Sequence, residues 1–185
     1  TGGAKALFPP AATVRSQIFR ALSADRSIRG AVSHLVAEGV LERSISESAW
    51  DQARARLPEA LLPALLRGVA AATAERFPST WRGREVVLVD GTTVSMPDEP
   101  ALAETFGYTE SKHGPSRFPT ARLLAVLHGG TRQVADYRLA PNRTSELALF
   151  RELLPTLPKG ALWVADRYFS SSVEFVLSAR HGVDW

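Results

Sequence analysis

One pattern occurs twice in this chain, in Val86-Val87-Leu88-Val89-Asp90 and in Leu162-Trp163-Val164-Ala165-Asp166. Each segment has four apolar residues, rich in β-branched and aromatic types, followed by an aspartate. Such a run predicts a buried strand, although its period alone also allows a short buried helix. A carboxylate placed where a strand leaves the core lies at the C-terminal edge of a sheet, where open α/β sheets bind ligands. One aspartate could be a helix cap, but two on the same pattern predict a shared site, most economically for a divalent metal.

The length and composition exclude several classes of protein. The chain has 185 residues, enough to bury a good core, and no cysteine, which excludes a disulfide framework and a cysteine-ligated zinc site. No stretch reaches transmembrane length and no basic-then-apolar leader opens the chain, so we expect a cytoplasmic protein with no membrane partner. Because the sequence begins with Thr1 and ends at Trp185, just after the start of an expected strand, we expect a C-terminally truncated fragment.

The net charge of +3 is mild. Residues 1–80 hold ten basic and seven acidic side chains, and residues 81–185 hold twelve of each. Of the 22 basic residues 19 are arginine, whose planar fork suits phosphate contacts, although solvated surface arginines explain the same count. The charge therefore permits a nucleic-acid partner without requiring one.

Residues 1–80 are expected to form an all-helical N-terminal region. Apolar residues recur there at helical spacing, and Ser44 and Glu47 have the spacing of a capping box ahead of a stripe that begins at Trp50. Pro63 is expected to break or offset the last helix, and residues 77–83 are expected to be a linker. The helices could bind DNA, or they could support a second domain or mediate dimerisation, and the pattern favours neither.

Residues 81–185 are expected to form a second domain that opens with strands. The run to Asp90 is followed by a mostly irregular stretch, residues 97–119. Two further strands, at 123–128 and 133–139, flank Gly129-Gly130-Thr131, which is a good hairpin signal. This part of the chain therefore predicts three strands in succession.

The rest of this domain is expected to alternate helix and strand. Thr144 or Ser145 can cap one helix, and Ser171 with Glu174 forms a capping box for another helix after the Asp166 strand. The order strand, strand, strand, helix, strand, helix resembles the mixed α/β sheet of the ribonuclease H-like fold. The first and fourth strands of that fold are parallel neighbours, so the two aspartates would lie side by side.

The two aspartates suit metal-assisted phosphodiester chemistry. Magnesium and manganese prefer hard oxygen ligands, and two such ions can activate an attacking oxygen and stabilise a leaving one. Asp90 could bridge two ions, and Asp166 could complete the shell of one. A third carboxylate is normally required. Glu174 is the only glutamate shortly after Asp166, and its place in the first turn of a helix makes it a capping residue rather than a ligand.

The motifs resemble, in order, those of IS4-type transposases, which belong to the DDE class on the ribonuclease H-like fold. The match begins with Trp81-x-Gly83-x-x-Val86-x-x-Val89-Asp90-Gly91-Thr92-Thr93, Pro97-Asp98-x-Pro100 and Phe106-Gly107. It continues with Phe118-Pro119-x-Ala121-Arg122, Gly130-Thr131, Glu146 and Ala165-Asp166-Arg167-Tyr168-Phe169. Upstream, Ser48-Ala49-Trp50-x-Gln52-Ala53-Arg54-x-Arg56-Leu57 is similar to the helical N-terminal domain of the same elements. Single motifs are weak, but the ordered series is fairly specific.

This resemblance implies a transposase of an insertion sequence. It makes Asp90 and Asp166 the first two members of a metal-binding triad that holds two Mg²⁺ or Mn²⁺ ions when complete. The implied partners are double-stranded DNA, at the transposon ends and the target, and a second copy of the protein. The family's third member is a glutamate in a Tyr-x-x-Arg-x-x-x-Glu-x-x-x-x-x-x-Lys motif, which would lie beyond Trp185. We therefore expect these 185 residues alone not to cleave DNA.

Six basic residues are candidates for contacts with a DNA backbone, although solvation or structural ion pairs would explain each equally well. They are Lys112, His113, Arg117, Arg122, Arg143 and Arg167. Two other functions stay open: a metal-dependent nuclease on the same fold, and a non-catalytic DNA-binding remnant of a decayed element. A haloacid-dehalogenase phosphatase is disfavoured, because its nucleophilic aspartate would stand where this chain has Leu88.

Overall fold

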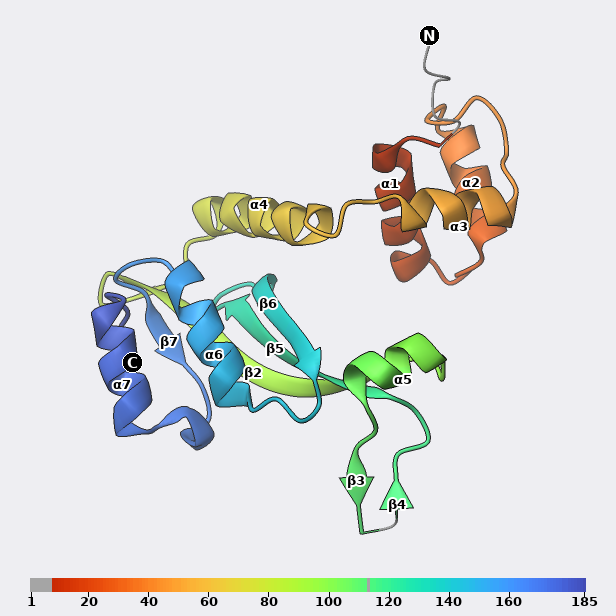
Figure 1. The fold of residues 1–185 in the computed structure, drawn as a ribbon. Helices are drawn as coiled ribbons and strands as arrows, with labels where there is room; N and C mark the ends of the chain where they lie inside the picture. Colours follow the sequence, from red (N-terminus) through yellow and green to blue (C-terminus); the bar gives the residue numbers. More distant parts are fainter. Residues whose placement is uncertain (1–7, 113) are drawn as a thin grey trace, which may run out of the picture. The chain divides into compact units, whose positions relative to one another are not determined.

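The computed structural model of this protein describes residues 8–112 and 114–185. They divide into two compact units, one ending at Leu61 and one running from Leu62 to Trp185. The first unit is helical, and the second combines a sheet with helices (Figure 1). The expected mixed α/β fold is therefore confirmed. Among the described residues, no helix is both long enough and apolar enough to cross a membrane.

The first unit packs three helices around a small core. They are α1 (Pro10–Leu22), α2 (Ile28–Ala37) and α3 (Glu47–Ala55). Trp50 is buried, and its indole N–H donates to Ser16 Oγ at 2.7 Å, which satisfies the polar end of this large side chain. The cap of α3 is Ser46, whose side chain accepts from the Ala49 N–H, so the capping residue predicted at Ser44 is wrong by two positions.

Helix α4 (Leu61–Arg76) groups with the sheet, although we expected it in an N-terminal region ending near residue 80. Its Arg67 reaches Asp136 of the sheet at 3.4 Å, and Ala70 is buried. Pro63 neither breaks nor offsets the helix, because it lies in the first turn, where the backbone N–H groups have no helical partner. The division by contacts thus falls before α4 rather than after it.

The main sheet has five strands. They are β1 (Thr80–Trp81), β2 (Arg84–Ser95), β5 (Thr120–His128), β6 (Val134–Pro141) and β7 (Leu162–Val164). β5 lies antiparallel between β2 and β6, whereas β7 pairs with β2 in parallel. A further parallel bridge joins Leu162 to Asp184. The segment expected to be a linker contains β1, which forms a tight hairpin with β2.

β2 is longer than predicted, because it continues five residues past Asp90 to Ser95. Val87 and Val89 are buried, and the side chains beyond Gly91 are exposed, so the strand leaves the core near Asp90 as expected. The strand nevertheless persists, because its pairing with β5 runs on to Ser95 and Thr120. Asp90 therefore lies within β2, at the level where pairing with the shorter β7 has ended.

The stretch expected to be irregular contains a short helix and a small hairpin. The helix is α5 (Pro100–Phe106), and the hairpin joins β3 (Glu110–Ser111) to β4 (Gly114–Pro115). The hairpin projects away from the main sheet (Figure 1). Hydrogen bonds from Met96 N to Pro119 O and from Thr120 N to Gly107 O close the base of this excursion.

The core of the second unit lies between one face of the sheet and two helices. They are α6 (Glu146–Leu153) and α7 (Ser172–Arg180), with the 3₁₀ turns η1 (Leu154–Thr156) and η2 (Arg167–Phe169) beside them. Ser145 caps α6 and Ser171 caps α7. The buried core includes Val87, Val89, Leu124, Val126, Leu149, Phe150, Leu153, Trp163 and Phe169. One face of the sheet is thus well covered.

Gly68 offers a test of how α4 is stabilised. It lies inside this helix, and a Cβ added there would meet nothing within 4 Å. We expect Gly68→Ala to raise the free energy of unfolding by about 0.5–1 kcal/mol, because alanine loses less conformational freedom in a helix than glycine. Urea unfolding followed by circular dichroism measures the change. A loss of stability would show that α4 packs differently around Gly68.

Candidate active site

The two predicted aspartates follow the paired part of β2 and β7 at the same spacing. Val86 pairs with Leu162, Val87 with Trp163 and Leu88 with Val164. Asp90 and Asp166 each come two residues after the last of these pairs. Asp90 follows the buried Val89, so its side chain is on the face opposite the core. Both aspartates are exposed, as a site for a dissolved ligand requires.

Each aspartate is oriented by a backbone hydrogen bond. Oδ1 of Asp90 accepts from the Gly91 N–H at 2.9 Å. Oδ1 of Asp166 accepts from the Tyr168 N–H at 2.8 Å and so caps η2. The other oxygen of each carboxylate has no protein partner among the residues that the structure describes, which leaves it available to a ligand.

This pair fits part of a divalent-metal site. One carboxylate on β2 and one just after β7 supply the hard oxygen ligands that magnesium and manganese prefer. Within the described part of the chain, however, no group of three or more histidine, aspartate or glutamate side chains could hold a metal ion. Asp90 and Asp166 would therefore need further ligands from water, from a phosphate or from another carboxylate.

An aromatic cluster supports the strand that carries Asp166. The Phe150 ring on α6 lies 4.7 Å from the Trp163 ring and 5.5 Å from the Phe169 ring, measured between centroids. The Trp163 indole N–H also donates to Ser178 Oγ on α7 at 3.1 Å. Trp163 and Phe169 flank Asp166 at three residues' distance on either side, so packing on both sides fixes its backbone.

Glu174 has a structural role, as its capping position predicted. It is fully buried, and its carboxylate accepts from Ser171 and from Arg151, with Arg151 Nη2 at 2.6 Å. Burial raises the pKa of the Glu174 carboxyl, but the hydrogen bonds from Ser171 and Arg151 outweigh burial, so the pKa lies below its ordinary value. With its oxygens occupied in the core, Glu174 is not available to a metal at Asp166.

The six predicted basic residues fall into separate places. Arg167 directly follows Asp166, and Arg143 follows the end of β6, which β5 separates from β2. Both are exposed, and neither forms an ion pair with a residue that the structure describes. Lys112 is exposed between β3 and β4, and Arg117 is exposed two residues after β4, with its guanidinium 5.4 Å from the centre of the Phe118 ring. His113 lies outside the described residues.

Arg122 is engaged in a different role. Its side chain is largely covered and donates to Glu146 Oε1 at 2.7 Å and to Asn142 Oδ1 at 3.4 Å. Arg122 pairs with Thr93 in the sheet, which places it on the face opposite Asp90. These contacts explain Arg122 as a structural residue, and they do not support a direct phosphate contact.

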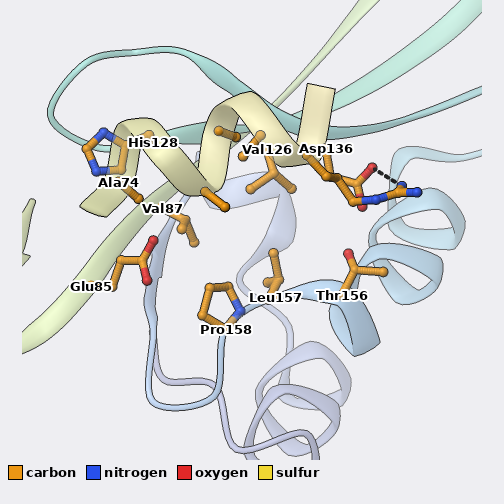
Figure 2. Close-up of a pocket in the computed structure, with 13 residues that line it drawn as sticks. Ala74, Glu85, Val87, Val126, His128, Asp136, Thr156, Leu157 and Pro158 are labelled. Carbon is orange, nitrogen blue, oxygen red and sulfur yellow. Dashed lines mark hydrogen bonds and ion pairs between the residues drawn. The ribbon is translucent and has the colours of Figure 1, made fainter. Parts of the chain in front are cut away.

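Among the described residues of this unit, one pocket adjoins an aspartate of the pair and another lies away from it. A pocket of about 280 Å³ is lined by Asp166 together with Trp163, Val164, Ala165, Ser170, Phe175 and Trp185. The other, of about 210 Å³, lies between α4 and the sheet, with His128 and Asp136 at opposite ends (Figure 2). Arg67 and Arg138 lie 3.4 and 3.5 Å from Asp136 Oδ1 and offset its charge. The pocket beside Asp166 therefore belongs to the candidate site.

Comparisons with known proteins show the family. A family model described as "Transposase DDE domain" matches residues 81–185, so the chain belongs to the DDE transposase domain family. The protein named "Putative transposase InsZ", from Escherichia coli (strain K12), is 32% identical over 130 residues. The match covers 69% of this chain and 44% of that protein, so this chain spans less than half the length of the curated relative.

Two solved structures are weakly similar to the chain. One is a Mos1 transposase paired-end complex with left transposon end, at 13% identity and a TM-score of 0.36. The other is a pre-cleavage Mos1 transpososome, at 11% identity and a TM-score of 0.36. Each alignment covers 100% of this chain and 60% of the other chain.

One feature of the site escaped the sequence argument. A Cβ on Gly91 would lie 2.5 Å from the Glu146 carboxyl carbon, so this carboxylate fills the space beside the residue after Asp90. In the sequence, Gly91 and Glu146 stand out only as separate members of the family motifs. The Asp-Gly dipeptide is itself a common turn signal, and it gives no indication that a distant glutamate requires the glycine.

Proposed function

We propose that the complete protein is a DDE transposase that cleaves DNA at transposon ends and transfers the freed strand to a target. The observation that carries this proposal is the parallel register between β2 and β7, whose last pair, Leu88 and Val164, lies two residues before each exposed aspartate. Membership of the DDE transposase domain family supports the same reading. We also propose that the protein is an IS4-type transposase, because its ordered motifs from Trp81 to Phe169 resemble those of that group.

The fold assignment supports this function. The strands β2, β5 and β6, then α6, β7 and α7, follow the order of a ribonuclease H-like domain, with the first and fourth strands parallel. We assign residues 81–185 to the N-terminal part of such a domain. The helices before it are candidates for binding transposon-end DNA, and the active complex is expected to be a homodimer.

Asp90 and Asp166 would hold Mg²⁺ or Mn²⁺, with two ions in the complete site. When bound, the ions would activate the attacking oxygen and stabilise the leaving one. Arg167, which directly follows Asp166, and the exposed Arg143 are candidates for phosphate contacts. The third carboxylate of the triad is expected outside these 185 residues.

The test uses the complete protein and a DNA fragment that bears the ends of its own element. We expect Asp90→Asn and Asp166→Asn each to lower Mg²⁺-dependent strand cleavage by at least about 100-fold, because each removes an anionic metal ligand. Gel assays of cleavage and of strand joining give the readout. The exposed Glu152 of α6 provides the control, and Glu152→Gln should leave cleavage unchanged.

Three outcomes would contradict parts of this proposal. Full activity of either aspartate variant would contradict the proposed metal-binding role of that aspartate. Cleavage without any joined product would favour a nuclease on the same fold. Magnesium-dependent cleavage by the 185-residue chain alone, abolished by Asp90→Asn, would show that the third carboxylate is not needed.

A further inference from the structure

We propose that Arg122 and Glu146 are positioning residues for Asp90, acting through the backbone of Gly91. The inference rests on the proposed function, because it concerns the metal-binding geometry of Asp90. Three motifs distant in sequence meet beside Asp90: Asp90-Gly91-Thr92, the Arg122 motif and the lone Glu146. The proposed chemistry uses only the first of these motifs.

The close approach at Gly91 is the first observation. If Gly91 carried a Cβ, the Glu146 carbon Cδ would lie 2.5 Å from it, with Oε2 at 2.7 Å and Oε1 at 2.9 Å. A carboxylate at the end of a flexible side chain could move away from such a contact at little cost. Whether it can move here depends on what holds Glu146.

Arg122 holds it. Arg122 Nη1 lies 2.7 Å from Glu146 Oε1, and the two side chains are only 25% and 22% exposed, so the ion pair is shielded from solvent. Nη2 of Arg122 also reaches Asn142, just before α6 begins. Glu146 is fixed from its own side too, because it is the first residue of α6, directly after the capping residue Ser145. The carboxylate is thus held between Arg122 and the strand.

The consequence reaches Asp90 through one hydrogen bond. The Gly91 N–H donates to Asp90 Oδ1 at 2.9 Å, so the orientation of this peptide sets the orientation of the carboxylate. Glu146 packs against Gly91 on the core face, while Asp90 is on the other face. The ion pair therefore supports the strand from behind, and glycine at 91 is required because a carboxylate occupies the place of its side chain.

A double-mutant cycle on the 185-residue chain tests the contact without any metal. We expect Gly91→Ala to raise the unfolding equilibrium constant about tenfold or more in the original background, because Glu146 must leave Arg122. In a Glu146→Ala background the same substitution should change it less than about threefold. Equal effects in both backgrounds would overturn the contact. If the Gly91→Ala variant does not fold, the test uses Glu146→Ala instead. Hydrogen exchange of the Gly91 amide should then be faster than in the original chain.

The position of Asp90 is read from the NMR signal of the Gly91 amide. Because this N–H bonds to Asp90, its exchange with solvent should be slowed in the original chain. We expect Arg122→Gln to accelerate that exchange and Arg122→Lys to restore part of the protection. Glu152→Gln, on the same helix as Glu146, is the control and should leave the exchange unchanged. Unaltered exchange in Arg122→Gln would overturn the positioning role.

Binding of Mn²⁺ separates positioning from simple charge. In the original chain, Mn²⁺ should selectively broaden the amide signals of Gly91 and Arg167. Removing the cation in Arg122→Gln would tighten Mn²⁺ binding if charge alone mattered, whereas loss of positioning should weaken it several-fold. Tighter binding would overturn the proposal. Absence of selective broadening in the original chain would count against the metal site itself. The double-mutant cycle and the exchange of the Gly91 amide would still decide the positioning role.

Discussion

Replacing Arg151 with methionine is expected to lower the free energy of unfolding by about 3 kcal/mol or more, because it leaves the Glu174 carboxylate buried without its cation. Glu174 is fully buried, whereas Arg151 is 47% exposed in its side chain, so losing the arginine costs more than losing the glutamate. Urea unfolding at neutral pH measures the loss. Arg180→Met, which removes an exposed arginine from α7, is the control and should have little effect.

The pH dependence of this variant has a defined sign. In the original chain the pKa of Glu174 is below its ordinary value, so its stabilisation is present above the ordinary glutamate pKa of about 4.3 and is lost as the pH falls through the lowered value. Without Arg151, burial dominates and raises the pKa, so protonation relieves the cost. The difference in stability between Arg151→Met and the original chain should therefore shrink on acidification.

A second substitution closes this test. Combining Arg151→Met with Glu174→Gln removes the buried charge and should recover most of the lost stability. If the double variant is as unstable as Arg151→Met alone, the arginine stabilises the core through packing of its stem rather than through the ion pair.

Phe150→Ala is expected to lower the free energy of unfolding by about 3–5 kcal/mol, because it empties the centre of the aromatic cluster. Phe150 has no exposed surface, and its ring contacts both Trp163 and Phe169. Urea unfolding measures the loss, and the near-ultraviolet circular dichroism of the aromatic rings should weaken. Tyr168→Ala, which removes a ring that is 53% exposed, should cost less than about 1 kcal/mol. Comparable losses in both variants would contradict this view of the core.

Local sequence patterns predicted much of the second unit. The Gly129-Gly130-Thr131 hairpin, the strand before Asp166 and the capping box at Ser171 and Glu174 are all found in the structure. Each of these features depends on residues close together in sequence, such as a turn or the first turn of a helix. Apolar runs also indicated which strands are buried, because burial on the core face demands them.

Long-range contacts explain what the sequence could not predict. The end of β2 at Ser95 is set by β5, whose pairing with it depends on residues about 30 positions away. The grouping of α4 with the sheet depends on Arg67 meeting Asp136. The Arg122–Glu146 pair joins a strand to a helix 24 residues later, and no periodicity connects the two. The candidate aspartates could be predicted from the sequence, but the side chains that support them could not.

The unequal lengths of β2 and β7 have a consequence for self-association. Past Leu88, no described strand pairs with the side of β2 that faces β7, where the Gly91 N–H bonds instead to the Asp90 side chain. Such an open edge can recruit a strand from another molecule. Here the edge carries Asp90, Thr92, Thr93 and Ser95, with Val94 as its one large apolar side chain. The charge and the hydroxyls disfavour unwanted strand addition while keeping the approach to Asp90 and Asp166 open.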